Sequence, residues 1–161
     1  MQTFLPYSNF AASAATLDDR RLNKQVVEAY QILTGRVPNR NHPACLMWQG
    51  QEDSLRLYIM ACCEEYTRRT GKQHACGAGM TAPKSATLPP WLCNRLFLLS
   101  HRVNLLRKEP DHYAPLFDSI PCDDLPSYPQ GYYWPVEPVG KKAKADRAAW
   151  IAWAEKNGLE A

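Results

Sequence analysis

The sequence predicts an all-α fold, a single compact domain of three or four principal helices with long irregular connections and an extended N-terminal arm. Apolar residues recur at helical spacing in two long segments, 17–33 and 90–108. Glycine- and proline-rich segments separate the helical ones, and the Pro-rich segment 109–140 lacks the alternation of a strand. A chain of 161 residues with 45% hydrophobic content is long enough for one well-buried core and short for two. We therefore expect one domain over residues 1–161.

The first long helix is expected over Leu17–Leu33. Successive helical residues turn by about 100°, which places the apolar side chains of this segment on one face. Thr16 and Asp19 resemble a capping box, a pair that satisfies backbone N–H groups at a helix start. Pro6 and several small residues precede this helix and predict an extended arm over residues 1–15.

A second helix is expected from about Ala44 to Arg69. Pro43 suits its first turn, and Gly71 suits its C-terminal end. Residues 72–90 then form a long loop, and loops of that length inside a compact domain are usually functional or mobile.

A third helix begins near Pro90 and continues to Lys108. The segment 109–140 is expected to be extended coil that wraps the helices. A last amphipathic helix closes the chain and stops at Gly158.

Glu28 lies on the polar face of the first helix, opposite the apolar side chains. Basic and amide side chains surround it there, namely Arg21, Lys24, Gln25 and Gln31. One interpretation is a surface ion pair of Glu28 with Lys24 or Arg21, and the other is a catalytic carboxylate inside a basic face. The periodicity leaves both open.

The six cysteines do not predict a metal site or an oxidising compartment. They lack the paired C-x-x-C spacing of a zinc site, and buried thiols are the default. The nearest approach to a metal cluster is His74 with Cys76, with His42 and Cys45 as more distant candidates. Two ligands one residue apart in a Gly-rich loop do not define a site, so we predict no metal and no cofactor.

The totals favour a soluble cytoplasmic protein, with no membrane partner and a monomeric state. No run of about 18 apolar residues is present, and the N-terminal segment lacks the features of a signal peptide. The net charge is +3, and basic residues gather in several clusters. Cations that converge on one surface are needed to bind phosphates, although any soluble helical protein displays such clusters.

Three blocks of the chain together resemble a known family. They are LDDRRLNKQVVEAYQIL at 17–33, RNHPACLMWQG at 40–50 and SHRVNLLRKEPDHY at 100–113, in a chain that opens MQTFLP. Their order and spacing resemble the pyrimidine-dimer DNA glycosylases of the endonuclease V type, in the bacterial and phage branch. The resemblance covers about residues 1–135, and residues 136–161 form a C-terminal helical extension outside it.

The resemblance implies a compact helical enzyme that grips duplex DNA at a damaged pyrimidine, cuts the glycosidic bond and nicks the backbone. It implies the free α-amine of the chain as nucleophile, here that of Met1, with Glu28 assisting. An α-amine ordinarily has a pKa of about 7.7 to 8.0, so a useful fraction is neutral at physiological pH. His42 either approaches this site from the start of the second helix or caps that helix.

The resemblance also implies a basic surround that holds phosphates. Arg20, Arg21 and Lys24 fit as phosphate clamps, and Gln31 can donate to a phosphate. We add Gln2 and Arg40 to the predicted DNA contacts.

Four residues of the third helix either reach phosphates or base edges, or tie that helix to the C-terminal coil. They are His101, Arg102, Asn104 and Arg107. The rings of Tyr132, Tyr133 and Trp134 either stack on bases or cover the core.

The N-terminus and the substrate leave alternatives open. Better-known members of the family expose a threonine, but bulky Gln2 should prevent removal of Met1, so Thr3 is only a rival nucleophile. Val27 and Gln31 stand where basic residues would be expected, which leaves a 5-substituted pyrimidine as a possible substrate. The alternatives to a glycosylase with AP-lyase activity are a non-catalytic DNA-binding module and an enzyme of modified-pyrimidine metabolism in phage DNA.

Overall fold

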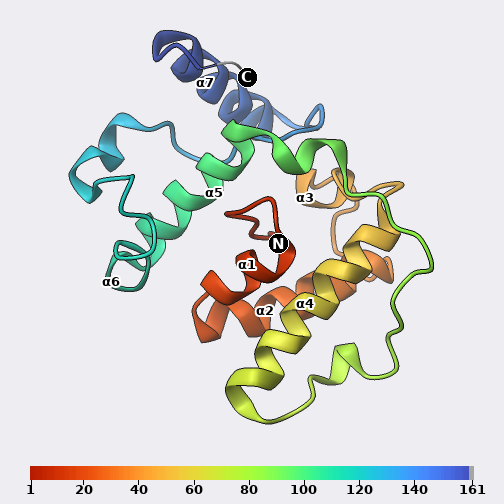
Figure 1. Cartoon of the computed structure of the whole chain (residues 1–161). Coiled ribbons are helices and arrows are strands. Elements are labelled where there is room, and N and C mark those ends of the chain that lie inside the picture. The colour runs from red at the N-terminus through yellow and green to blue at the C-terminus, as the bar shows by residue number, and fades with distance from the viewer. Residues whose placement is uncertain (160–161) are drawn as a thin grey trace. The chain divides into compact units, whose positions relative to one another are not determined.

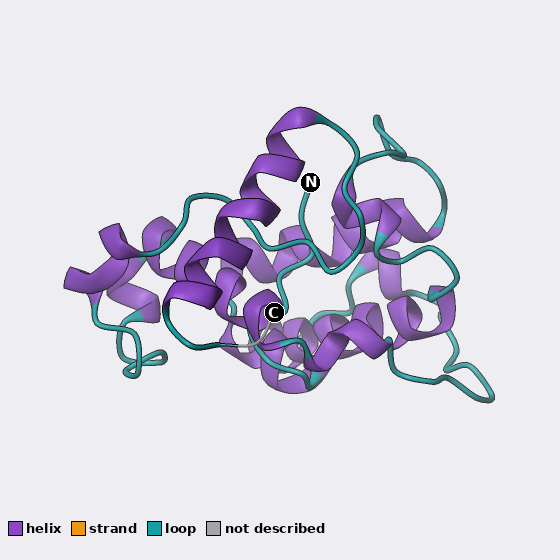
Figure 2. Cartoon of the chain, turned by 90° about the horizontal axis from the view of Figure 1, so that it is seen from above, coloured by secondary structure: helices purple, strands orange, loops and turns teal. Residues whose placement is uncertain are grey.

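The computed structural model describes residues 1–159, and these form helices, turns and loops without a strand (Figure 2). The four longest helices in this part of the chain are α2 (Asp19–Leu33), α4 (Glu52–Thr70), α5 (Arg95–Lys108) and α7 (Lys141–Lys156) (Figure 1). The prediction of an all-α fold with three or four principal helices and long irregular connections is therefore confirmed for these residues.

The backbone contacts divide the chain into two compact units. The first spans Met1–Pro89, and the second begins at Pro90. Each unit is described by itself below, and their union into one domain stays a prediction. Among residues 1–159, no helix has both the length and the hydropathy that a bilayer crossing requires.

The first unit is built on α4, which packs against α1 (Phe10–Thr16) and α2. The prediction of an extended arm over residues 1–15 was wrong in its length, because α1 occupies its second half. Asn9 begins this helix by accepting a hydrogen bond from the Ala12 backbone N–H. The alanines that follow have high helix propensity. The extended part of the arm covers residues 1–5, and residues 6–9 bend into α1.

The cap of α2 also differs from the prediction. Asp18, and not the pair of Thr16 and Asp19, accepts the hydrogen bond from the Arg21 N–H. Thr16 lies in the last turn of α1, where its hydroxyl donates to the Ala12 carbonyl. The start of the helix was therefore predicted correctly to within two residues, but from the wrong side chains.

The predicted second helix is two helices. The short helix α3 (Pro43–Leu46) is followed by a turn, and α4 begins only at Glu52. Gly50 lies in this turn with φ of 72°, a left-handed conformation that interrupts a helix. The C-terminal prediction is confirmed, since Gly71 caps α4 with φ of 68°.

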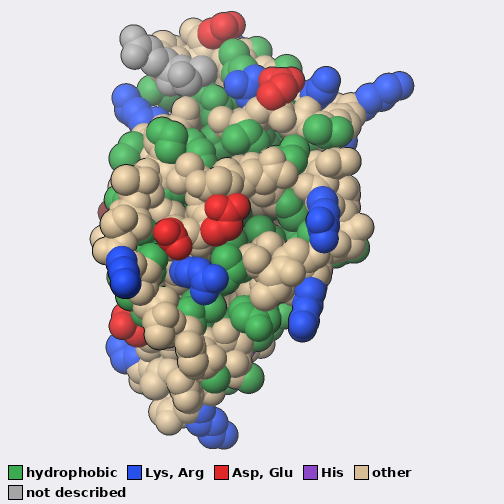
Figure 3. Space-filling model, turned by 90° about the vertical axis from the view of Figure 1, so that its right-hand side faces the viewer, with side chains coloured by type: hydrophobic (Ala, Val, Ile, Leu, Met, Phe, Trp, Pro, Cys, Tyr) green, Lys and Arg blue, Asp and Glu red, His purple; other side chains and the backbone are tan. Residues whose placement is uncertain are grey.

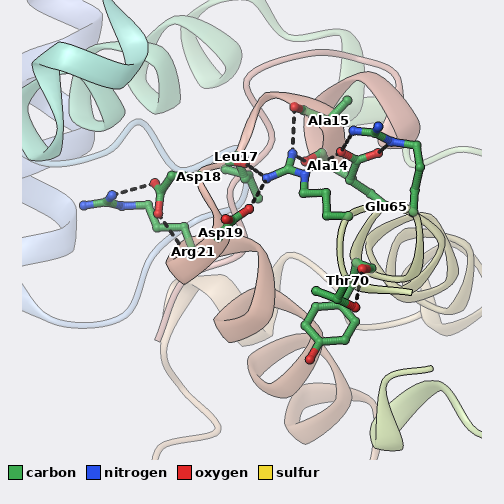
Figure 4. Close-up of polar contacts among 11 residues, drawn as sticks. Ala14, Ala15, Leu17, Asp18, Asp19, Arg21, Glu65 and Thr70 are labelled. Atoms are coloured by element: carbon green, nitrogen blue, oxygen red, sulfur yellow. Dashed lines mark hydrogen bonds and ion pairs between the residues drawn. The ribbon is translucent and has the colours of Figure 1, made fainter. Parts of the chain in front are cut away.

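A charged cluster fastens the end of α4 to the connection between α1 and α2 (Figure 4). The Arg69 guanidinium donates to the backbone carbonyls of Ala15 and Leu17 and pairs with Asp19 at 2.9 Å. Glu65 holds Arg69 at 2.6 Å from the other side and also pairs with Arg68. The cluster fixes the far end of α4 relative to α2.

The long loop 72–90 is fastened at two places. The short 3-10 helix η1 (Ala75–Gly77) follows His74, whose ring contacts Asn23 of α2, and the Ser54 hydroxyl donates to the Thr87 carbonyl. His74 Nδ1 accepts from the Cys76 N–H, so Nε2 carries the proton and donates to Asn23. Both ring nitrogens of this metal-ligand candidate are thus occupied by structural hydrogen bonds.

The second unit begins with the 3-10 helix η2 (Pro90–Cys93), and Asn94 then caps α5. A short helix α6 (Pro110–Tyr113) and the 3-10 helix η3 (Cys122–Ser127) interrupt the predicted coil. The last helix, α7, buries Trp150 and lies against Tyr128 through Trp150 and Trp153. It ends at Lys156, close to the predicted stop at Gly158.

Candidate active site

The N-terminal arm is held in the first unit by side chains of α2 and α4. Gln25 of α2 donates from Nε2 to the Gln2 carbonyl at 2.9 Å and accepts at Oε1 from the Phe4 N–H. The Tyr58 hydroxyl of α4 lies 2.7 Å from the Phe4 carbonyl and 2.8 Å from Gln25 Oε1. Gln25 and Tyr58 are both 0% exposed. The arm is therefore fixed by buried polar contacts along its backbone.

Aromatic packing supports the same part of the arm. The Trp48 indole N–H donates to the Thr3 hydroxyl at 3.0 Å, and Thr3 is fully buried. Trp48 stacks on Tyr58 at 6.0 Å between ring centroids, and Phe10 packs edge-on against Tyr58. Thr3 is therefore an interior anchor of the arm.

This anchoring brings the chain terminus to Glu28. The α-amine of Met1 lies 3.9 Å from Glu28 Oε1, and the Gln2 N–H donates to Glu28 Oε2 at 3.2 Å. The side chains of Met1 and Glu28 are 9% and 12% exposed. The Met1 thioether contacts the Cys45 thiol at 3.5 Å, which holds the first residue from its other end.

Lys24 forms the ion pair that the sequence allowed for Glu28. Its Nζ lies 3.6 Å from Glu28 Oε1, and the lysine side chain is 67% exposed. A pair this exposed contributes little to stability. The ion pair leaves the second carboxylate oxygen to the Gln2 N–H, so the ion pair and a catalytic role are compatible.

His42 also combines the two roles considered for it. Its Nδ1 accepts from the Ala44 N–H and caps α3. Burial and the nearby α-ammonium lower the pKa of His42, while Glu28 raises it. The ring is therefore neutral at neutral pH, with its proton on Nε2, and it lies within electrostatic reach of both Met1 and Glu28.

The other predicted DNA contacts of the first unit differ in exposure. Arg20 and Arg40 are exposed, and Arg40 borders a cavity of about 170 Å³ that Cys45 and Trp48 also line. Arg21 is held by Asp18 at 2.6 Å, and Gln31 is half-buried.

Gln2 lies in the interior of the first unit, where it is 8% exposed. Its Oε1 accepts from the Thr3 N–H, while its Nε2 is buried and finds no hydrogen-bond partner among the described residues. A buried donor without a partner is costly.

In the second unit, the structure favours the structural alternative for three of the four α5 residues. His101 is 0% exposed between the rings of Phe97 and Tyr132, and burial lowers its pKa to about 3. Asn104 donates to the Ser100 and Gly131 carbonyls. The Arg107 guanidinium donates to three carbonyls of the following coil, those of Leu125, Tyr128 and Pro129.

Arg102 is half-buried and lines a groove with Arg95. Tyr133 and Trp134 are 5% and 4% exposed, which favours core cover over stacking on bases. Tyr132, half-buried, contacts both His101 and Trp134.

Sequence reasoning missed the residues that position the arm. Gln25, Tyr58, Trp48 and Cys45 all contact residues 1–4. The available signal was Gln25, a polar side chain beside the apolar face of its helix, but nothing local identifies its partners.

The fold and site thus define an all-α protein whose N-terminal amine is held beside a helical carboxylate. Residues 1–76 match the model of the pyrimidine dimer DNA glycosylase family. This segment contains Met1, Glu28, His42 and the residues that hold the arm. Comparison with curated proteins and with solved structures gave no match.

The family match confirms the resemblance over residues 1–76. The third block, at 100–113, lies beyond this match, so its part in the resemblance stays a prediction. The match covers less than half of the chain, and the description of the family names its members as DNA glycosylases.

Proposed function

We propose that the protein is a DNA glycosylase with AP-lyase activity that acts on damaged or modified pyrimidines in duplex DNA. The observation that carries the proposal is the Met1 α-amine, 3.9 Å from Glu28 Oε1 in a largely buried site. This site lies in the segment that matches the glycosylase family.

In the proposed reaction, the neutral Met1 amine attacks C1′ of the damaged nucleotide. The C1′–N bond breaks, and the base leaves with its electron pair and takes up a proton. Loss of the amine proton and opening of the sugar ring then give an imine at C1′. The Glu28 carboxylate, which pairs with Lys24, stabilises the cationic sugar in the transition state.

The imine prepares the strand cleavage step. It acidifies the C2′ proton, which the Glu28 carboxylate removes, and the 3′ phosphate leaves in a β-elimination. His42 is neutral and uses Nδ1 for the α3 cap, so it acts as a hydrogen-bond donor from Nε2 and not as the base. Hydrolysis of the imine would free the enzyme.

The exposed cations of the first unit are proposed to hold the phosphates. Arg20, Lys24 and Arg40 are exposed enough to reorient, whereas Arg21 is restrained by Asp18. We retain Gln2 because its buried Nε2–H is a donor that an acceptor of the substrate can satisfy. We leave out His101, Asn104 and Arg107, whose polar groups lie in the interior or bind the coil.

The proposal is tested by reduction with borohydride in the presence of DNA. A panel of duplexes would contain an abasic site, a pyrimidine dimer or a 5-substituted pyrimidine. We expect a covalent protein–DNA adduct with the abasic duplex and with at least one altered base. Binding without an adduct on any duplex would reject the catalytic proposal and favour a DNA-binding module.

A further inference from the structure

The side-chain amide of Gln25 contacts the backbone of the arm on both sides of Thr3. Its Nε2 donates to the Gln2 carbonyl at 2.9 Å, and its Oε1 accepts from the Phe4 N–H at 2.6 Å. In an extended chain these two backbone groups lie on the same edge, where a neighbouring strand would pair with them. The Gln25 amide takes the place of that strand and fixes which residues of the arm lie opposite it.

Tyr58 holds Gln25 in this orientation. Its hydroxyl contacts both Gln25 Oε1 and the Phe4 carbonyl. Burial raises the pKa of Tyr58, so the hydroxyl keeps its proton and remains a donor. The amide of Gln25 therefore cannot rotate to exchange its oxygen and nitrogen without losing these contacts.

Gln25 and Glu28 lie three residues apart on α2, which makes them neighbours on one side of the helix. Gln25 pairs with residues 2 and 4 of the arm, while Glu28 faces the nitrogens of residues 1 and 2. The same helix thus fixes both the register of the arm and the carboxylate. Since an extended chain advances about 3.3 Å per residue, a slip by one residue would change which nitrogen faces Glu28.

We propose that Gln25, held by Tyr58, is a positioning residue that sets the register of the N-terminal arm and so the separation between the Met1 amine and Glu28. The part of this proposal that concerns activity rests on the proposed function. Gln25 acts through the arm and touches no substrate.

The first test compares Gln25→Met and Tyr58→Phe with a matched control, Ser54→Ala. Ser54 is 1% exposed and makes a long-range hydrogen bond to the Thr87 carbonyl in the same unit, away from the arm. Two quantities are measured, the hydrogen-exchange protection of the Phe4 amide and the single-turnover rate of borohydride trapping at saturating abasic DNA.

We expect Gln25→Met to lower Phe4 protection and to slow trapping by roughly tenfold to a hundredfold, because small misplacements of a reacting group cost that much. The dissociation constant for DNA should stay unchanged, and Tyr58→Phe should act in the same direction with a smaller effect. Ser54→Ala should leave both quantities unchanged. Trapping by Gln25→Met at the wild-type rate would overturn the inference.

A second test leaves Gln25 and Tyr58 intact and adds one glycine before Met1. The register predicts an amine displaced by about 3.3 Å from its place near Glu28. Trapping should then be lost while Phe4 stays protected, and undiminished trapping would overturn the inference. This test also decides the matter if Gln25→Met does not fold.

The two proposals can fail separately. If the wild-type protein gives no adduct on any duplex, the proposed function fails. The register is then judged by Phe4 exchange alone, and unchanged protection in Gln25→Met would overturn it.

Discussion

Glu28 faces solvent on one side and the chain terminus on the other. Lys24 pairs with it from the exposed side, while the Met1 amine and the Gln2 N–H lie on the buried side. A surface ion pair alone would require only the first of these contacts. The buried side is what relates this carboxylate to the proposed imine chemistry.

Replacement of Glu28 by glutamine separates catalysis from stability. The Glu28→Gln side chain keeps an acceptor for the Gln2 N–H but loses the charge and the base, so we expect strand nicking to fall by roughly two orders of magnitude or more, with DNA binding retained. The free energy of unfolding should change by less than about 1 kcal/mol. Nicking kinetics and chemical denaturation measure these effects.

The control for this variant is Glu64→Gln, which changes an exposed carboxylate of α4. It should leave nicking and stability unchanged. If Glu28→Gln nicked DNA at the rate of the control, Glu28 would have no catalytic role and would act only in an ion pair.

At the scale of single residues, the sequence pointed to the candidate reacting groups, but it did not predict the side chains that position them. Glu28 could be singled out because helical periodicity needs no tertiary information, and Met1 followed from the family resemblance. Gln25 and Tyr58 could not be paired, because their contact joins positions 33 residues apart. His101 was misleading for a related reason, since its helix is covered by the later segment that contains Tyr132.

At the scale of elements, the junction between α4 and the α1–α2 connection depends on Glu65. Hydrogen bonds from Arg68 and Arg69 outweigh burial and lower the pKa of Glu65 to about 2. A carboxylate whose pKa is lower in the folded state stabilises the fold at pH values above its unfolded pKa. This stabilisation is lost as the pH falls toward the folded value.

We therefore expect Glu65→Gln to lower the free energy of unfolding at neutral pH by roughly 1 to 3 kcal/mol, the range for hydrogen bonds to charged groups. The difference from wild type should shrink as the pH falls from about 4.5 to about 2. Urea denaturation of both proteins across this range measures it. A difference that does not depend on pH would contradict the assignment.

Arg107 makes the corresponding connection for α5, through three carbonyls of the coil that follows. Arg107→Met should lower the melting temperature, since it leaves those carbonyls without their donor. DNA affinity and its salt dependence should not change. If Arg107→Met instead bound DNA more weakly and kept its melting temperature, Arg107 would contact DNA.

At the scale of the whole molecule, the charge that bears on DNA binding is the small net charge of the chain. Figure 3 shows Lys and Arg side chains scattered over the face it presents, with acidic side chains among them. With a net charge of +3, DNA binding should depend on individual phosphate contacts more than on a strong overall field.

Arg20 offers the cleanest test of such a contact, because it is exposed on the helix that carries Glu28. Arg20→Met should weaken binding to different DNA sequences equally and reduce the slope of log affinity against log salt by about 1. The melting temperature should stay unchanged. If the slope of log affinity against log salt did not change, Arg20 would not contact a phosphate in the complex.

The four long helices were largely predictable, α2 and α5 from their apolar periodicity and α4 and α7 from the glycines near their ends. What escaped prediction is local. The short helix α1 lies in a segment whose small residues also suit a coil, and the break at Gly50 interrupts an apolar pattern that continues on both sides. The cap at Asp18 depended on where α1 ends, which the sequence did not reveal.

The most direct measurement locates the covalent bond itself. Borohydride-reduced adduct with abasic DNA would be digested and the modified peptide identified by mass spectrometry, after the intact mass has shown which residue begins the chain. The account predicts a chain that begins at Met1 and a sugar remnant on the Met1 α-amine. An adduct on the Lys24 side chain, or on Thr3 after loss of Met1 and Gln2, would contradict it.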